Sequence, residues 1–375
     1  MCVAINDIVK LRPSVAVTFN GGYVEFFLSD IRKTVTVKLQ SEVVSVLFKL
    51  NGTQSLNDFF ISANITDLQQ QTAFFKLISF LNENHIVINI DEPYIVEYEQ
   101  YSRVFSILEN YYSKQSEINN AFKKIQKSRV MIVGLGSVGT WVTQSLMMSG
   151  VSKFVLVDAD NVELSNLHRQ FGFGEKSIGC KKTTAMKERL LQSNKNIEVE
   201  CIDEMLTCDF FTNHKFDQID LIINCADKPS VDITSLIVSE YAMQYGIPHI
   251  VGGGYNLHLT LIGQVVIPGK TACCECFRLA LNELNDIDTT NIRKLPKKSE
   301  VIGSFPPLSN LAASIAANEA FKILAGLENE LVMKNNRTEF NISDMNFHNI
   351  KIERNEKCKW CGYEGKYYQL SRNKD

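Results

Sequence analysis

The spacing of hydrophobic and polar residues predicts two differently built regions. In the first 90 residues, short alternating runs and amphipathic stretches are separated by polar turns. This pattern predicts a hairpin from 14–20 and 23–29 across Gly21-Gly22, a strand at 34–39, helices at 41–50 and 67–84, a polar turn after Gly52 and a strand at 86–90. Helices that accompany a β-hairpin are typical of a small winged-helix-like domain.

From residue 128 onward, short apolar runs alternate with helical segments. The runs predict strands at 130–133, 154–157, 197–201, 221–224 and 249–252, and two more at 260–267 and 340–342. The alanine-rich segment 310–324 predicts a helix that packs in the core or at a dimer interface. Strands that alternate with helices build a doubly wound, mainly parallel sheet of the Rossmann kind. We therefore expect an α/β fold divided into 1–90, 91–127 and 128–375, the middle part being a linker and a partly helical lead-in.

The composition is that of an ordinary globular protein. Of 375 residues, 45% are hydrophobic and 22% are charged, and 39 Lys and Arg against 42 Asp and Glu give a net charge of -3. This balance disfavours nucleic acid as a partner, so a peptide paired with a strand edge suits the winged-helix-like domain better than DNA does. No apolar run has the length of a membrane span, and the N-terminus lacks a secretory signal pattern, so we expect a cytoplasmic protein without a membrane partner.

The most informative stretch is a glycine turn between the first two strands of the second region. The sequence VMIVGLGSVG places Gly134, Gly136 and Gly139 between a strand and a helix, and Asp158 ends the next strand 19 residues after Gly139. Together these form the full context of a nucleotide-binding fingerprint. The glycines let the backbone approach a phosphate at a helix N-terminus, and the acid is placed to accept hydrogen bonds from a ribose. A glycine turn that only packs helix on strand is the alternative.

The residues after Asp158 favour a nucleoside triphosphate over a dinucleotide. Arg169 and Gln170 lie in NLHRQ, Lys182 lies at the start of the helix KKTTAMKERLLQ, and Asp227 follows the apolar strand LIINCA. Cations neutralise phosphate charge, and one carboxylate can hold a Mg²⁺ whose other ligands are waters and phosphate oxygens. The set therefore predicts ATP and a catalytic Mg²⁺ on Asp227. The plain alternatives are a solvated lysine and an aspartate that caps the next helix.

Four of the ten cysteines form two pairs with a two-residue spacer, Cys273 with Cys276 and Cys358 with Cys361. Two such pairs supply the four thiolates of a closed, structural Zn²⁺ site. A redox motif of the thioredoxin type would need only one pair. Cys225, inside LIINCA, is expected to be a small buried residue and not a nucleophile.

Together these residues resemble the ubiquitin-activating-enzyme-like (ThiF/MoeB/MccB) adenylating family over residues 101–362. The family pattern is matched by Gly134, Gly136, Gly139, Asp158, Asn166, Arg169, Gln170, Lys182, Asp227 and the two cysteine pairs. The stretches CADKP, PGKTACCEC and FPPLSNLAA resemble the members that modify ribosomally made peptides, such as the microcin C and pantocin enzymes.

The resemblance implies a homodimer that uses ATP and Mg²⁺ to adenylate a carboxylate or carboxamide of a small ribosomal precursor peptide, toward a modified peptide antibiotic. Residues 1–90 would then bind the peptide or its leader, and 128–375 would be the adenylation domain. Arg169, Lys182 and Asp227 would act on the phosphates and the metal, and Arg103 matches a position from which the family reaches a partner's site. Residues 277–357 contain no cysteine where thioester-forming relatives carry one, so we expect no transthiolation.

Three alternatives remain open. In the same fold, the substrate would be the C-terminal glycine of a ubiquitin-like sulfur carrier, although such activators generally do without a domain like residues 1–90. A catalytically silent nucleotide-binding scaffold would lack Arg169, Lys182 or Asp227, and all three are present. An NAD-dependent oxidoreductase is the third alternative.

Overall fold

Two compact units make up the chain, Met1–Lys123 and Lys124–Asp375. The structure, a computed structural model, describes residues 3–39, 41–252, 259–284 and 303–368. The functional division into a peptide-binding part and an adenylating part stays a prediction.

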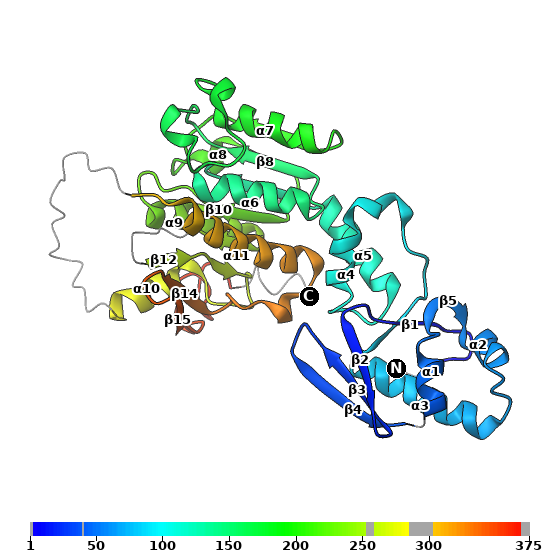
Figure 1. The fold of residues 1–375 in the computed structure, drawn as a ribbon. Helices are drawn as coiled ribbons and strands as arrows, with labels where there is room; N and C mark the ends of the chain where they lie inside the picture. The colour runs from blue at the N-terminus through cyan, green and yellow to red at the C-terminus, as the bar shows by residue number, and fades with distance from the viewer. Residues whose placement is uncertain (1–2, 40, 253–258, 285–302, 369–375) are drawn as a thin grey trace. The chain divides into compact units, whose positions relative to one another are not determined.

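The first unit begins with two small antiparallel sheets and three helices (Figure 1). Its elements are β1 (Ile8–Leu11), β2 (Val15–Asn20), β3 (Tyr23–Leu28), β4 (Lys33–Lys38), α1 (Ser41–Leu47), β5 (Asn51–Ser55), α2 (Leu56–Ser62), α3 (Leu68–Glu83) and β6 (Val87–Asn89). One sheet has the order β2-β3-β4 and the other β5-β1-β6. Both contribute to one core, in which Phe26, Phe59 and Ile78 are almost fully buried.

The hairpin prediction is confirmed, because Gly21 and Gly22 both have positive φ, as a tight two-residue turn between twisted strands requires. The long helix is confirmed as α3, with Asp67 as its N-cap. The polar turn after Gly52 is wrong, because Asn51–Ser55 is strand β5, paired with β1. Helix α1 accordingly ends at Leu47 and not at residue 50.

The first unit continues through a short helical segment. It contains the 3₁₀ helix η1 (Val96–Tyr101), α4 (Ser102–Leu108) and the start of α5 (Gln115–Lys127). The rings of Tyr98, Phe105 and Phe122 pack on one another with centroids 4.7–6.2 Å apart. Asp91 accepts hydrogen bonds from the backbone N–H and the hydroxyl of Ser116, at 2.9 and 2.6 Å. Residues 91–123 therefore pack within this unit.

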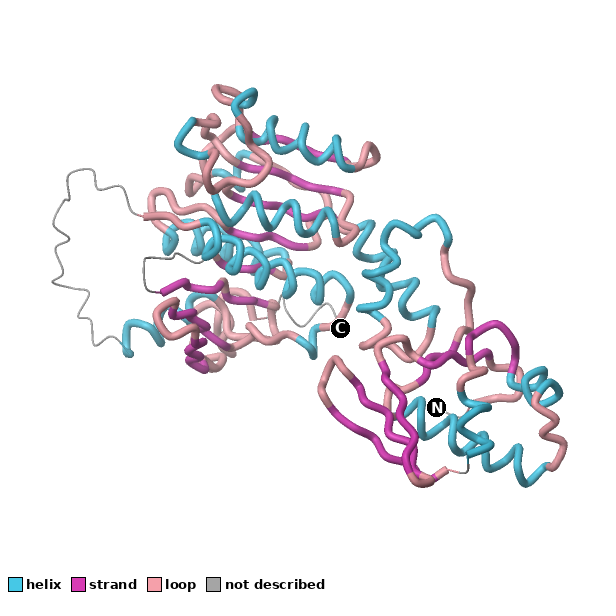
Figure 2. The backbone as a smooth tube through the Cα atoms, in the orientation of Figure 1, coloured by secondary structure: helices cyan, strands magenta, loops and turns pink. Residues whose placement is uncertain are grey.

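The second unit is built on a six-stranded sheet of order β13-β11-β10-β7-β8-β9. Figure 2 shows strands of this unit in magenta among cyan helices. Its strands are β7 (Arg129–Val133), β8 (Lys153–Val157), β9 (Glu198–Ile202), β10 (Leu221–Asn224), β11 (His249–Val251) and β13 (Gln264–Val266). Five are parallel, and β13 pairs antiparallel with β11. The α/β, mainly parallel fold class is therefore confirmed.

Helices cover both faces of this sheet. They are α6 (Ser137–Met148), α7 (Lys182–Ser193), α8 (Phe210–Asn213), α9 (Val231–Tyr245), α10 (Cys274–Leu284) and α11 (Pro306–Ala325). Met131 and Val133 pack with Val238 and Ala242 of α9 on one face. Because side chains alternate along a strand, Ile132 points to the other face, where Figure 1 shows α6, α7 and α11. The apolar helix α11 packs mainly on α6. None of the described helices is long and apolar enough to cross a membrane.

A smaller antiparallel sheet completes the unit, with the order β12-β14-β15. Its strands are β12 (Leu259–Ile262), β14 (Asn336–Asn341) and β15 (Asn346–Lys351). The single strand predicted at 260–267 is wrong, because the chain leaves one sheet after β12 and enters the other at β13. Gly263 marks the change: a Cβ there would stand 2.6 Å from the carbonyl oxygen of Val251. Only glycine permits this close backbone approach.

Substitution of Gly139 by alanine should destabilise the second unit. Gly139 lies in the first turn of α6, and an added Cβ would overlap the carbonyl oxygen of Gly134. Overpacking of about 1–3 kcal/mol corresponds to a Tm lowered by roughly 3–10 °C in a unit of this size. Thermal unfolding followed by circular dichroism measures the effect.

Gly136→Ala is the matched control. A Cβ at Gly136 meets no atom within 4 Å, and its φ of -78° suits alanine. This variant should keep its Tm within about 2 °C of the parent protein. Equal Tm values for the two variants would contradict the packing role assigned to Gly139.

Candidate functional site

A pocket of about 720 Å³ opens at the carboxyl ends of β10, β7 and β8. These three strands are in register, because Val133 pairs with Asn224 on one side and with Val157 on the other. The chain runs outward from β7 in both directions, so the pocket lies where the strand order reverses, the usual ligand position in open α/β sheets. Gly134 and Gly136 line it, together with the first residues of α6.

Asp158 organises the glycine loop and also lines the pocket. Its carboxylate accepts hydrogen bonds from the backbone N–H groups of Leu135, at 2.6 Å, and Asp160, at 2.8 Å. The side chain is only 9% exposed. The sequence places this acid for a ribose, and in the structure it ties the loop after β7 to the loop after β8.

Lys182 is buried among carboxylates. Its Nζ lies 2.9 Å from Asp160 Oδ2 and 3.9 Å from Asp158 Oδ1, and its side chain is 7% exposed. The alternative of a solvated helix lysine is therefore wrong. Burial raises the pKa of Asp160, but the hydrogen bond from Lys182 and the charges of Lys182 and Lys228 outweigh this effect and hold it below its ordinary value. A fixed cation at a helix N-terminus is well suited to bind phosphate.

The segment 166–170 supplies the next wall of the pocket. Asn166 is buried and caps the short turn η2 (Leu164–Asn166), with its Oδ1 accepting from the N–H of Glu163 at 2.9 Å. Arg169 lines the pocket and donates to the carbonyl oxygen of Ser165. Gln170 also lines it, and its buried Oε1 has no partner among the described residues.

Asp227 lies on the opposite wall, in the loop after β10. It is exposed, lines the pocket, and no hydrogen bond or ion pair in the described part of the chain engages its carboxylate. The cap of α9 is Ser230, whose hydroxyl accepts from the N–H of Ile233, so the capping alternative for Asp227 is wrong. A single free carboxylate beside a phosphate-binding loop fits a Mg²⁺ ion that keeps waters and phosphate oxygens as its other ligands.

Cys225 contributes to the pocket wall, and its side chain is half-buried there. Desolvation raises the pKa of its thiol to about 12, which favours the protonated form. The expectation that Cys225 is not a nucleophile stays a prediction.

The ionisable groups that line the pocket are unequal in number. Its described carboxylates are Asp158, Asp160, Glu163, Glu204 and Asp227, whereas its cations are Arg169, Lys182 and Lys228. A polyphosphate entering this surplus of negative charge needs further positive charge, which a divalent ion and a cation from elsewhere would supply.

Four residues of this set are absent from the sequence prediction: Asp160, Glu163, Glu204 and Lys228. Two of them form an ion pair and lie close in sequence to predicted residues: Asp160 stands two positions after Asp158, and Lys228 directly follows Asp227. The spacing DAD and the lysine in CADKP were the available signals. The ion pair that joins the two residues depends on strand order, which no local pattern reveals.

Arg103 belongs to the first unit. It lies in α4 and is exposed, and no hydrogen bond or ion pair between described residues involves its side chain. It is absent from the residues that line the described pocket.

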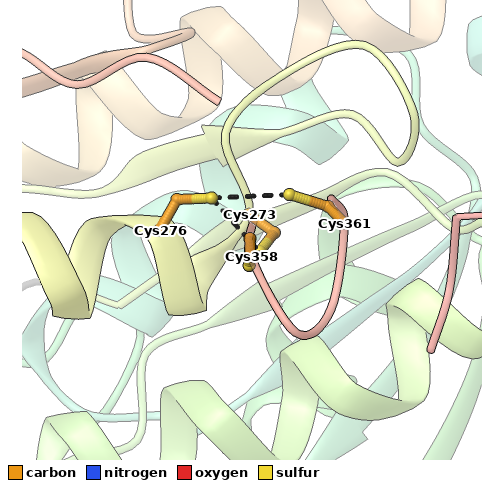
Figure 3. Close-up of side chains that lie close together, drawn as sticks. All are labelled: Cys273, Cys276, Cys358 and Cys361. Atoms are coloured by element: carbon orange, nitrogen blue, oxygen red, sulfur yellow. Dashed lines mark hydrogen bonds between the residues drawn. The ribbon is translucent and has the colours of Figure 1, made fainter. Parts of the chain in front are cut away.

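The four paired cysteines lie together, as Figure 3 shows. Their sulfur atoms are buried and all lie within 4.8 Å of one another, with 3.8 Å between Cys273 and Cys276, 3.6 Å between Cys273 and Cys358, and 3.4 Å between Cys276 and Cys361. A disulfide would need about 2.05 Å, whereas zinc–sulfur bonds of about 2.3 Å in a tetrahedron imply roughly 3.8 Å between sulfurs. The cluster therefore fits a closed four-thiolate zinc site.

Backbone groups support this cluster. The N–H of Asn355 points at Cys276 Sγ and that of Trp360 at Cys358 Sγ, both at 3.4 Å. N–H groups directed at sulfur stabilise thiolates and orient metal ligands.

Comparisons with known proteins agree with this geometry. Residues 112–360 match the ThiF family. The sulfur carrier protein ThiS adenylyltransferase of Bacillus subtilis is 28% identical over 254 residues, which are 64% of this chain and 66% of that protein. SUMO-activating enzyme subunit 2 of Dictyostelium discoideum is 30% identical over 166 residues, 43% of this chain and 24% of that protein. The chain thus spans less than two thirds of the length of these relatives.

Solved structures resemble the chain over nearly its whole length. E. coli MccB with ATP has a TM-score of 0.72 at 24% identity and covers 94% of this chain and 99% of its own. PaaA has a TM-score of 0.67 at 18% identity and covers 91% and 99%. At these identities the likeness concerns the fold, including the small antiparallel sheets of the first unit. Since the family match takes in well over half of the chain, this protein belongs to the ThiF family of E1-like adenylyltransferases.

Proposed function

We propose that this enzyme adenylates a carboxylate or carboxamide of a small ribosomally made precursor peptide, in the maturation of a peptide antibiotic. For a carboxylate, an oxygen attacks the α-phosphorus of ATP, the bond to the β-phosphate oxygen breaks, and pyrophosphate leaves behind an acyl adenylate. The observation that carries this proposal is the pocket itself, which the glycine loop lines together with Lys182, Arg169 and Asp227, whose carboxylate has no partner among the described residues.

The residues present can be given distinct tasks in this reaction. Lys182, fixed by burial, would offset charge on the phosphates, and Arg169 would do so from the neighbouring wall. The N–H groups of the glycine loop and of the α6 N-terminus would position the triphosphate. Mg²⁺ held by Asp227 would supply electrostatic stabilisation of the departing pyrophosphate.

The peptide part of the proposal rests on the first unit. Strand β4 lies at the edge of the β2-β3-β4 sheet. The N–H of Leu39 bonds to the carbonyl of Gly22 beside β3, so by alternation the N–H groups of Thr34 and Thr36 point to the open edge. Both threonines are exposed. An extended peptide can add to such an edge through its main chain.

Solved neighbours favour a peptide over other substrates. Structures of E. coli MccB carry the peptide MccA together with an ATP analogue in one case and a modified form, MccA-N7isoASN, in another. The fold shared over nearly the whole chain includes the first unit, which supports assigning the same kind of partner here.

The nucleotide and peptide halves of the proposal can be separated by two variants. Asp227→Ala should lower ATP–pyrophosphate exchange by at least about 100-fold, because the metal–phosphate contact is lost, and should leave peptide affinity within about twofold. Thr36→Pro should weaken peptide binding about tenfold, because it removes an edge donor, and should preserve ATP binding. Candidate peptides come from small open reading frames beside the gene, with binding measured by fluorescence anisotropy.

Thr36→Val is the control for the edge variant. It removes the same hydroxyl and retains the N–H, so its peptide affinity should equal that of the parent protein. A weakened Thr36→Val would mean that the side chain, and not the strand edge, holds the peptide. Tight binding by Thr36→Pro would remove β4 from the proposal.

The proposal extends to a homodimer in which Arg103 completes the partner's site. The surplus of carboxylates in the pocket calls for another cation, and Arg103 is exposed without an ion-pair partner among the described residues. Closed twofold assemblies place the same surface of each copy against the other, so one residue can serve the partner's site in both directions.

Mixed dimers test this sharing. Arg103→Ala and Asp227→Ala should each be inactive alone, and mixing with subunit exchange should restore about a quarter of the parent activity. Random pairing makes about half of the dimers mixed, and each has one of two sites intact. Subunit exchange is verified with differently tagged chains. No recovery despite exchange would place Arg103 in its own chain's site or outside the reaction.

The cysteine cluster is proposed to hold one structural zinc per chain. Cys358→Ser should lose the metal, measured by plasma mass spectrometry, and lower the Tm by about 10 °C or more, because metal binding contributes directly to folding. Cys274→Ser is the control, since Cys274 is buried beside the cluster but is not one of the four. It should keep its zinc. The assignment would be contradicted if the parent protein were as stable without a bound metal as with one.

Adenylation of a sulfur carrier's C-terminal glycine is the second candidate function. The B. subtilis relative acts on the sulfur carrier ThiS by name, which favours it. The exchange assay decides between the two, because a carrier protein ending in glycine would replace the peptide as the substrate that stimulates exchange.

A further inference from the structure

Lys228 is the one cation among the described pocket residues that the proposed reaction does not use. It directly follows Asp227 in the loop after β10. Its Nζ lies 3.4 Å from Oδ2 of Asp160, which belongs to the loop after β8.

This ion pair crosses the glycine loop. Strands β8 and β10 flank β7, and the register aligns Val157, Val133 and Asn224. Gly136, Asp160 and Asp227 therefore each stand the same number of residues after the aligned end of their own strand. With neighbouring strands about 4.8 Å apart, the outer two are separated by roughly 10 Å, so a long side chain is needed to bridge them. An anion on the glycine loop would lie beside this bridge.

The two lysines that share Asp160 differ in freedom. Lys182 is 7% exposed and lies close to two carboxylates, whereas the side chain of Lys228 is 64% exposed and, among the described residues, pairs with Asp160 alone. An exposed ion pair contributes little stability, so Lys228 can leave Asp160 at small cost. Asp160 keeps Lys182 as a counter-ion when this happens.

We infer that Lys228 is a further phosphate-binding residue, which exchanges Asp160 for an oxygen of the polyphosphate when a nucleoside triphosphate binds. This inference rests on the proposed function. The physical reason is the surplus of carboxylates in the pocket. Of the two described lysines that line it, Lys228 is the more exposed, and it lies on the wall that also carries Asp227. Its ammonium group would reduce the repulsion that a polyphosphate meets there.

Binding measurements on the full chain test the inference. Calorimetry gives the Kd of ATP with Mg²⁺, of AMP and of adenosine for the parent protein and for Lys228→Gln, which keeps a polar side chain, one atom shorter, and removes its charge. We expect Lys228→Gln to weaken ATP about tenfold, AMP less, and adenosine by less than twofold. Lys228→Arg should recover most of the ATP affinity. Lys176→Gln, an exposed lysine outside the pocket, controls for the change in net charge.

A double-mutant cycle with Asp160→Asn separates phosphate contact from a purely structural ion pair. If Lys228 binds phosphate, Lys228→Gln should still weaken ATP when Asp160 is already replaced. Loss of the effect in that background would overturn the inference, because Lys228 would then act only by holding the loop of Asp160. An unchanged ATP affinity in Lys228→Gln would also overturn it while leaving the proposed function intact. A parent protein that binds no ATP would remove the proposed function, and this inference with it.

Discussion

The parallel pairing of β10, β7 and β8 in one register is the constraint on which the site depends. The hydrogen bonds that align Asn224, Val133 and Val157 end at one edge of the sheet, so the three loops that follow begin side by side. The loop after β7 carries the glycines, the loop after β8 carries Asp158 and Asp160, and the loop after β10 carries Asp227 and Lys228. A shift of one residue in either pairing would turn the side chains at that strand's end to the opposite face. Burial on both faces of the sheet prevents such a shift.

The carboxylates that hold the loops of this pocket in place also oppose the binding of an anionic ligand. Asp158 and Asp160 hold the loops and Lys182 in place, and this structural use of carboxylates leaves the pocket acidic. An acidic pocket repels a free polyphosphate, so binding depends on positive charge that arrives with the nucleotide or moves toward it. If Asp227 holds the proposed Mg²⁺, nucleotide affinity would therefore depend on the divalent ion.

Sequence patterns were sufficient wherever the deciding interactions are local. The Gly21-Gly22 turn, the capped helix α3 and the glycine fingerprint each depend on neighbours in the chain, and the structure has all three. Strand β5 was missed because NGTQS is polar and turn-like, and it becomes a strand only through pairing with β1. The break at Gly263 was missed because its cause, the carbonyl of Val251, is distant in sequence.

The candidate site divides in the same way. Residue type and spacing predict which residues belong to the site, but they do not predict the ion pairs or the burial of those residues. The pairing of Asp160 with Lys182 and Lys228 follows from strand order, and the burial of Lys182 follows from the packing of α7 against the sheet. The two cysteine pairs are the exception. Four thiols in two pairs with two-residue spacers fit one tetrahedral metal site, so their spacing alone predicts that they lie together.

That cluster also explains how the last described part of the second unit is ordered. Residues 352–368 follow β15 and contain no helix or strand, so they have little secondary structure to fix them. Cys358 and Cys361 join this segment to Cys273 and Cys276, and Arg354 joins it to the carbonyl oxygen of Gly269 at 2.6 Å. These links lie beside β13, the antiparallel neighbour of β11. A metal at the cluster would thus replace the apolar core that so short a segment cannot build, and would fix the β13 edge of the sheet, opposite the β9 edge.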